Sequence, residues 1–589
     1  MGSEDHSWEL EEGIPQVEDP FIQQYLKGRD ALIVEEQKRR HGKTPEWALD
    51  QVLNSSLDAN FRKSLSPIAA RACKIVSQIR AREQRELWTH VLGDAAAHPS
   101  EEILFPGVMF QHAKRHMERT NMWKIVEKMP KGSLLHAHMD AMFDIDFLID
   151  QAFKTPGIHL SAPKPLIAPH DYDVAPVAFQ FSSRAQGNSE TPSLWSEAYE
   201  PSTLIPIQAA ADSFPRDGEA GFREWLKSRC MVMPEHSYHH HHGVDAIWSV
   251  FSRTFPIVNS ILMYEPILRA CLRRMLAELS TDGIRYVEFR IAFVFEYRKE
   301  GKDVPEESYD EFCRIVDEEV TNFKETEEGK NFYEARIIWT TLRRSSNADI
   351  VDSMKECIAV KQSFPDLICG FDLVGSEDLG RPLVDIVPML FWFRKRCAEE
   401  GVDIPFFFHA GECLGDGDET DHNLFDAILL GTRRIGHGFS LYKHPLLIDL
   451  VKDKKILVEC CPISNEILRL TSSIKSHPLP ALLSRGVPVS LCNDDPAILG
   501  HGKNGLTHDF WQVMQGLENV DLAGLAMMAQ NSIRWSCYED QSTAEWKAEV
   551  GDGVLGNGVK AARLREWLSD FEKFCEWVVL EFAEFDEDD

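Results

Sequence analysis

Residues 404–439 read IPFFFHAGECLGDGDETDHNLFDAILLGTRRIGHGF and carry the clearest signal of fold class. An apolar run, an amphipathic helical segment and a second apolar run follow one another in this stretch. This succession is typical of a parallel βαβ unit, because parallel strands require a long crossover connection. Each apolar run ends in a histidine, His409 in the first and His437 in the second.

The same alternation continues on both sides, from about Val244 to Trp535, and one further strand is expected earlier in the chain. The other strand candidates share β-branched or aromatic composition and few-residue length; they are 133–141, 283–293, 335–344, 367–375, 456–462 and 487–495. Together with the two runs above they number eight, which is the count that closes a TIM (β/α)8 barrel. We therefore predict an α/β fold, a (β/α)8 barrel over residues 126–545.

Three segments lie outside this pattern. Residues 1–125 have apolar positions three and four apart and are expected to form an N-terminal helical region. An insertion at about 150–243, after the first strand, is rich in Pro, Ser and Ala and is expected to be mostly loop. Residues 546–589 should form a C-terminal helix and a solvated acidic tail, FAEFDEDD.

Composition limits the partners. The 589 residues contain 63 basic and 94 acidic side chains, a net charge of −31, which would repel a nucleic acid polymer and an anionic membrane. The sequence has no apolar run of the roughly 18 residues that a membrane helix needs, and no signal peptide, so a cytoplasmic location is expected. The 13 cysteines are scattered, which predicts reduced thiols and no cysteine-based metal site.

Four polar clusters fall at the carboxyl ends of predicted strands, where such barrels assemble their active sites. His136 and His138 are two apart on the first strand and so face the same side. With His409 and Asp494 they would offer three imidazoles and one carboxylate, a set suited to one zinc ion. Glu412, three residues beyond His409, is a candidate proton donor.

The chain resembles the adenosine deaminases, whose fold is a barrel of the metal-dependent amidohydrolase type, and is most similar to the adenosine-deaminase-related growth factors. The resemblance covers nearly the whole chain. It rests on the motifs KMPKGSLLHAHMDA, GFDLVGSED, PFFFHAGE, RIGHGFSLYKHP, ECCPISNEILRL, SLCNDDPAILG and NSIRWS.

The resemblance implies deamination of adenosine, or a closely related adenine nucleoside, to inosine and ammonia. One Zn²⁺ per chain would be held by four ligands, His136, His138, His409 and Asp494. Glu412 would protonate N1 of the purine, and His437 would orient and deprotonate the attacking water.

The resemblance also implies the contacts to the substrate. Asp495 would hydrogen-bond N7, the backbone of Gly375 would meet N3, and Asp140 would contact the ribose. Trp248 matches an aromatic residue of the nucleoside pocket in the growth-factor branch. Because that branch dimerises through N-terminal helices, a homodimer is expected here.

The chain departs from the growth-factor pattern in several places. Members of that branch are typically secreted and have a disulfide in the insertion, whereas this insertion has no cysteine between Cys73 and Cys230. Leu342 and Ser376 stand where relatives often have histidines. The sugar side of the pocket is therefore expected to differ.

Three alternatives remain open. A 5′-phosphorylated substrate (AMP, ADP or ATP) could be held by Arg343, Arg344, Lys503 and the histidine run 239–242. The second alternative is a different mononuclear metal hydrolase on the same barrel. The third is a non-catalytic interaction protein. The combination of Glu412 and Asp495 favours a purine over an ester.

Overall fold

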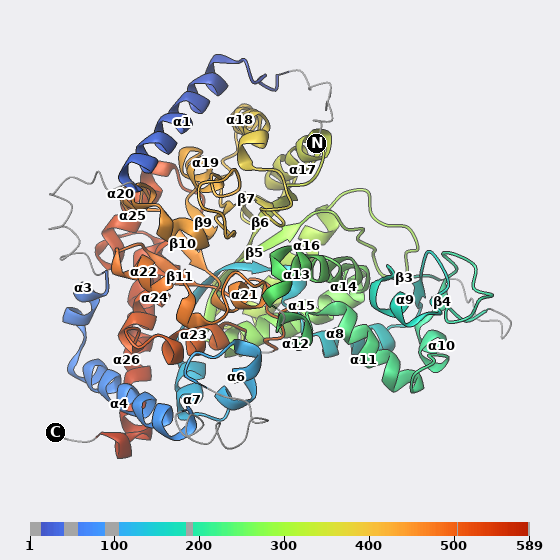
Figure 1. The fold of residues 1–589 in the computed structure, drawn as a ribbon, viewed down its shortest axis with the longest axis horizontal. Helices are drawn as coiled ribbons and strands as arrows, with labels where there is room; N and C mark the ends of the chain where they lie inside the picture. The colour runs from blue at the N-terminus through green and yellow to red at the C-terminus, as the bar shows by residue number, and fades with distance from the viewer. Residues whose placement is uncertain are drawn as a thin grey trace.

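Eight parallel strands form a closed barrel at the centre of the molecule (Figure 1). The computed structural model describes residues 13–40, 57–88, 105–183, 192–238, 240–502 and 505–586. The barrel strands are β1 (Gly132–His138), β5 (Ile284–Ala292), β6 (Glu334–Leu342), β7 (Ile368–Val374), β8 (His409–Ala410), β9 (Arg434–His437), β10 (Leu457–Cys460) and β11 (Val489–Leu491). All eight predicted strands are therefore present.

Two four-stranded sheets make up the barrel, in the orders β1-β5-β6-β7 and β11-β10-β9-β8. Parallel bridges from Phe371 to Phe406 and from Ala137 to Asp494 join their edges. The second bridge places Asp494 beside the end of β1, where the His138 amide donates to the Asp494 carbonyl over 2.8 Å. The closure of the barrel thus brings together sequence segments more than 350 residues apart.

Helices follow the strands and cover the outside of the barrel. Helix α16 buries Phe312, Ile315 and Val316 on one face, the amphipathic pattern expected of a barrel helix. Helix α17 begins at a Ser346 cap, whose hydroxyl accepts from the Asp349 amide. The outer helices are α15 (Glu265–Thr281), α16 (Asp310–Lys324), α17 (Asn347–Ser363), α18 (Leu383–Glu399), α19 (Asn423–Leu429), α20 (Pro445–Asp453), α21 (Pro462–Ile467), α22 (Leu479–Ser484), α23 (Gly505–Gly516) and α24 (Leu522–Arg534).

The insertion after β1 has more regular structure than predicted. A three-stranded antiparallel sheet, in the order β3-β2-β4, projects from the barrel together with α9 to α11 (Figure 1). The prediction of mostly loop was wrong here, because strands of two to four residues are too short to show an alternating pattern. The elements are α8 (Ile145–Lys154), β2 (Ile158–Ser161), α9 (Pro169–Val174), β3 (Ala178–Phe181), β4 (Ile205–Pro206), α10 (Ile207–Asp212) and α11 (Gly218–Cys230).

An aromatic cluster forms a local core for this insertion. Trp195 packs edge-on against Phe214 at 4.8 Å and against Trp225 at 5.3 Å between ring centroids. The chain then returns to the mouth of the barrel through α12 (Pro234–Ser237), α13 (Gly243–Phe251) and α14 (Thr254–Leu262). These last helices carry side chains into the cavity described below.

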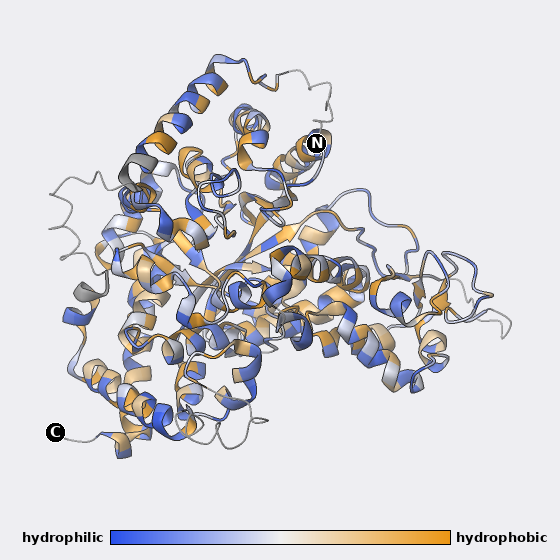
Figure 2. Ribbon diagram, in the orientation of Figure 1, coloured by the Kyte–Doolittle hydropathy of each residue, from blue (hydrophilic) through white to orange (hydrophobic). Residues whose placement is uncertain are grey.

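The N-terminal helices pack on the same chain. Helix α4 buries Ile75, Val76 and Ile79 and lies beside the C-terminal helix α26. Helix α1 lies on α19 and α20, where Tyr25 donates to Asp426 over 2.7 Å. Hydrophobic and hydrophilic residues alternate along α1 (Figure 2). The helices are α1 (Pro20–Arg40), α3 (Leu57–Ser64), α4 (Pro67–Glu83), α6 (Phe110–Met117) and α7 (Asn121–Lys128).

The C-terminal segment is α25 (Thr543–Asp552), α26 (Val559–Glu581) and a short tail. Phe582 is buried, and Asp586 forms an ion pair with Arg71 of α4 at 2.5 Å. The expectation of a solvated tail is therefore wrong for Phe582 and Asp586 but holds for the exposed Ala583 and Glu584, while residues 587–589 lie outside the described part. Among the described residues, no helix has the length and apolar character needed to cross a membrane.

Candidate functional site

Three histidines and one aspartate meet at the carboxyl ends of the barrel strands. His136 and His138 come from the end of β1, His409 from β8, and Asp494 from the loop after β11. The ligand atoms of these four side chains all lie within 4.8 Å of one another. The structure thus brings together the four residues that the sequence predicted as metal ligands.

The distances from Asp494 in this cluster fit ligand atoms that share one metal ion. Ligand atoms about 2.0–2.2 Å from such an ion lie roughly 3.3 Å apart. Asp494 Oδ1 lies 3.2 Å from His136 Nε2 and 3.3 Å from His138 Nε2. Asp494 Oδ1 and His136 Nε2 are buried and have no hydrogen-bond partner among the described residues. Two buried polar atoms that face each other without a hydrogen bond are typical of two ligands of the same metal ion.

Carboxylates behind the cluster fix the histidine rings. Glu459 Oε2 is 2.9 Å from His136 Nδ1, and Asp372 Oδ2 is 2.6 Å from His409 Nδ1. Arg290 bridges the two acids, at 2.9 Å from Asp372 and 2.6 Å from Glu459. This arrangement turns the Nε2 atoms of both rings toward the cluster and selects their tautomer.

Both acids are charged despite complete burial. Burial raises the pKa of Asp372, but His409 and Arg290 outweigh it and leave that pKa below its usual value. Arg290 and Arg434 lower the pKa of Glu459 in the same way. The sequence reasoning missed both residues. The available signal was an acid inside an otherwise apolar strand, in GFDLVG and in ILVECCP.

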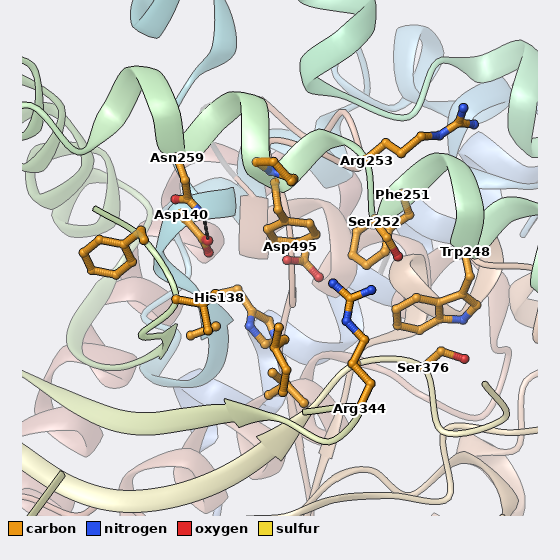
Figure 3. A pocket seen from close by; sticks show the side chains of 18 of the residues that line it. His138, Asp140, Trp248, Phe251, Ser252, Arg253, Asn259, Arg344, Ser376 and Asp495 are labelled. Atoms are coloured by element: carbon orange, nitrogen blue, oxygen red, sulfur yellow. Dashed lines mark hydrogen bonds between the residues drawn. The ribbon is translucent and has the colours of Figure 1, made fainter. Parts of the chain in front are cut away.

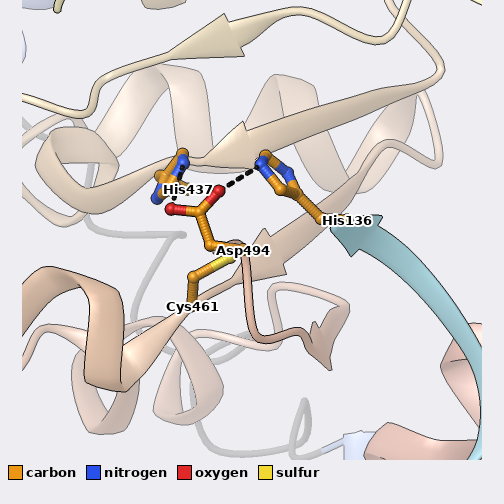
Figure 4. A group of neighbouring side chains, drawn as sticks. All are labelled: His136, His437, Cys461 and Asp494. Atoms are coloured by element: carbon orange, nitrogen blue, oxygen red, sulfur yellow. Dashed lines mark ion pairs between the residues drawn. The ribbon is translucent and has the colours of Figure 1, made fainter. Parts of the chain in front are cut away.

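A second group of potential ligands overlaps the first. His437 and Cys461 lie with His136 and Asp494, again with ligand atoms within 4.8 Å (Figure 4). Cys461 does not line the cavity, whereas His138 and His409 do. Burial also raises the pKa of the Cys461 thiol well above its usual value, which disfavours the thiolate that binds metal. The set with three histidines and Asp494 is therefore the better match for an ion that must face a substrate.

Glu412 lies beside the cluster with an unusual charge state. Burial, followed by the charges of Asp494 and Glu377, raises the pKa of Glu412 well above its usual value. Glu377 accepts from the amides of Gly411 at 3.2 Å and Glu412 at 2.8 Å, so it holds the HAGE turn in place. Glu377 was not predicted, although it belongs to the LVGSED motif. A protonated Glu412 can donate a proton to a substrate.

His437 ends β9 in a left-handed backbone conformation, with φ of 62°. Its Nδ1 lies 3.6 Å from Glu412 Oε1, and its Nε2 lies 3.8 Å from Asp494 Oδ2. Burial lowers the pKa of His437 well below its usual value, so the ring is neutral. A neutral imidazole beside the metal cluster is able to accept a proton.

A cavity of about 780 Å³ opens onto these groups (Figure 3). This volume lies in the range of small-molecule sites. The four predicted substrate contacts, Asp140, Trp248, Gly375 and Asp495, all line it. Asp140 accepts from Asn259 over 2.8 Å, a partner on α14 that the sequence did not suggest. Burial and the charge of Asp494 raise the pKa of Asp495 well above its usual value, so its carboxyl group can donate a hydrogen bond.

The cationic residues proposed for phosphate separate in the structure. Arg343 is buried and donates to the carbonyls of Leu373 and His409, which is a structural role. Arg343 and Arg344 both line the cavity, and of the two only Arg344 is exposed. His241 and His242 are exposed and do not line it, while Lys503, His239 and the side chain of His240 lie outside the described part.

A closed (β/α)8 barrel with a histidine–carboxylate cluster and a buried acid at its carboxyl end defines a hydrolase of the amidohydrolase class. The family model for adenosine deaminase matches residues 233–552. The chain belongs to the adenosine deaminase family and is a hydrolytic deaminase.

Known relatives cover most of the chain. Adenosine deaminase 2-A of Danio rerio is 30% identical over 485 residues, 81% of this chain and 88% of the relative. An adenosine deaminase of Lutzomyia longipalpis is 34% identical over 437 residues, 73% of this chain and 79% of the relative. A solved amidohydrolase from Burkhoderia ambifaria, with bound Zn, has a TM-score of 0.48 and 14% identity over 80% of this chain and 98% of that one. The resemblance found in the sequence is confirmed.

Proposed function

We propose that this chain hydrolyses the 6-amino group of adenosine, or of a closely related adenine nucleoside, with one zinc ion per chain. The observation that carries the proposal is the meeting of a metal-ligand cluster, a protonated Glu412 and a neutral His437 on one cavity. His136, His138, His409 and Asp494 would hold the ion. When bound, zinc supplies the Lewis acidity that activates water near neutral pH.

The protein's own groups would then handle the protons. Glu412 donates a proton to N1 of the purine, which makes C6 more electrophilic. His437 accepts the proton of the water that attacks C6 and passes it to the amino group. The C6–N bond breaks, ammonia leaves, the proton of the C6 hydroxyl returns to Glu412, and inosine remains.

Other cavity residues would orient the purine. Asp495, protonated, donates a hydrogen bond to N7, and the Gly375 amide meets N3. The φ of +107° at Gly375 is a conformation that other residues rarely adopt, so a side chain there would be strained. Asp140, held by Asn259, contacts the sugar, and Trp248 packs against it.

The test is the conversion of adenosine by the purified, zinc-loaded chain. Equal amounts of inosine and ammonia are expected, and cytidine should be unreactive because it lacks the imidazole ring that Asp495 recognises. The absence of ammonia from adenosine and from its nucleotides would refute the proposal.

We also propose a homodimer that involves the N-terminal helices. The apolar face of α4 is covered by α26 of the same chain, so the contact must use other surface. Helix α1 offers Phe21, which is 72% exposed, and Val34, which is 48% exposed. Light scattering at micromolar concentration should give twice the chain mass, and Phe21→Asp should lower it. A monomer would contradict this.

A reducing, cytoplasmic location is likewise proposed. All thirteen cysteines are unpaired thiols, and twelve of them are buried. Reduced thiols in this number fit a compartment kept reducing by glutathione. Fractionation of the source cells should recover the chain with the cytosol, and recovery from the medium would contradict the proposal.

A further inference from the structure

The two walls of the cavity differ in chemistry. Carboxylates and histidines gather at the end that holds His138 and Asp495. The opposite wall carries Arg344, Trp248, Ser252 and Ser376 (Figure 3). A cation on this wall is notable because the chain as a whole has 94 acidic and only 63 basic side chains.

Arg344 projects into the cavity. Its side chain follows the end of β6, and its guanidinium group points between Asp495 and Trp248 (Figure 3). The preceding residue, Arg343, is only 1% exposed and donates to carbonyls of the barrel. Both arginines lie in the turn that follows β6 and both line the cavity, but Arg343 is bonded to barrel carbonyls whereas Arg344 is exposed.

Arg344 has no partner in the described part of the chain: no hydrogen bond or ion pair involves its guanidinium group. The other arginines that line the cavity, Arg253, Arg298 and Arg343, each have at least one partner in the protein. Arg298 pairs with Glu296 at 2.6 Å, and Arg253 donates to the Ser249 carbonyl over 2.7 Å. Arg344 therefore presents its donors to whatever enters the cavity.

The neighbours of Arg344 suit an anionic ligand. Ser376 accepts from the Leu379 amide at 3.2 Å, which leaves its hydroxyl hydrogen available to a ligand. The Ser252 hydroxyl lines the same wall. A planar guanidinium with hydroxyl donors is the combination that binds phosphate oxygens, because the guanidinium fork matches two of them at once.

We propose that this wall binds a phosphate group on the sugar of the substrate, so that the preferred substrates are adenine nucleotides. This inference rests on the proposed function, since it assigns the second half of the same cavity. The adenine ring would lie at the metal end, and the phosphate would lie against Arg344, Ser252 and Ser376.

The experiment compares AMP with adenosine, each by kcat/KM and by calorimetric binding, in the wild-type chain and in Arg344→Ala. We expect AMP to be preferred at low salt, with the preference falling as salt rises. Arg344→Ala should lower kcat/KM for AMP about tenfold or more and change that for adenosine by less than about twofold. Arg344→Lys keeps the positive charge but not the two parallel donors of the guanidinium group. Its kcat/KM for AMP should lie between the values for the wild type and for Arg344→Ala.

Arg485→Ala is the matched control, because Arg485 is exposed and does not line the cavity. This variant should leave kcat/KM and binding unchanged for both AMP and adenosine. If kcat/KM in Arg344→Ala falls equally for AMP and adenosine, or falls for neither, the proposed phosphate site is overturned. The proposal of deamination would still stand. If neither compound is turned over by the wild type, the proposed function fails. Calorimetry then still decides the inference: AMP binding that Arg344→Ala does not weaken would overturn it.

Discussion

The metal end of the cavity and its opposite wall are built in contrasting ways. At the metal end, each histidine ring of His136 and His409 is fixed by a buried carboxylate, and Arg290 ties the two carboxylates together. At the opposite wall, Arg344 is exposed and has no partner among the described residues. Contacts within the protein therefore hold the first region in place, whereas we propose that a ligand supplies the missing partner in the second.

This contrast separates chemistry from selectivity. Reaction at C6 requires groups held within fractions of an ångström, and a buried network provides that. Selection among substrates with different sugar or phosphate groups requires only a few accessible hydrogen-bond donors at the mouth of the cavity. Substitutions at the metal end should therefore lower the turnover of every substrate by a similar factor. Substitutions at the opposite wall should lower the turnover of some substrates more than that of others.

The largest effect is expected from the metal ligands. His409→Ala or Asp494→Ala removes a ligand from the set of four and should abolish both zinc binding and deamination of adenosine and AMP. Metal analysis and ammonia release measure the two losses. A variant that keeps stoichiometric zinc would show that the ligand was assigned wrongly.

Glu412→Gln should come next. The amide keeps the shape of the side chain but has no acidic proton for N1, so turnover should fall by about 10²–10⁴-fold with zinc still bound. Turnover of adenosine and of AMP should fall by the same factor. Near-normal turnover would mean that another group protonates the purine.

Asp372→Asn addresses the carboxylate behind His409. Loss of this charge should weaken zinc binding by about 10–100-fold. It should also lower the melting temperature, since breaking a buried ion pair costs about 3–5 kcal/mol. Asp352→Asn on the surface of α17, where Asp352 is 69% exposed, is the control and should change neither. Unchanged zinc affinity in Asp372→Asn would indicate that the acid serves only the fold.

The smallest effect is expected from Cys461→Ala, which separates the two possible ligand groups at the metal end. Zinc content and turnover should stay near the wild-type values, because Cys461 does not line the cavity and its thiol is protonated. Loss of the metal in this variant would assign the ion to the group that contains His437 and Cys461.

The sequence predicted the metal end better than the opposite wall. Barrel strands alternate regularly with helices, so the eight strands and the residues at their ends, such as His409 and Asp494, could be placed from periodicity and motif. The supporting acids Asp372 and Glu459 were missed because nothing local marks an acid in a strand as a partner of a distant histidine. Their partners lie 37 and 323 residues away along the chain.

The opposite wall depends on how the insertion folds back. Trp248 and Asn259 reach the cavity only because α13 and α14 return to the barrel mouth, and the loop-like composition before them gave no sign of this path. The sequence proposed Arg343 and Arg344 together as phosphate ligands. Both line the cavity, and only the course of the turn after β6 distinguishes the buried Arg343 from the exposed Arg344.

The most direct test of the account is ammonia release from adenosine by the purified chain before and after a chelator removes its metal. We predict that activity disappears with the metal and returns as zinc is added back, reaching its maximum at one equivalent per chain. Full activity in the metal-free chain, or a maximum that requires two equivalents, would contradict a single zinc held by His136, His138, His409 and Asp494.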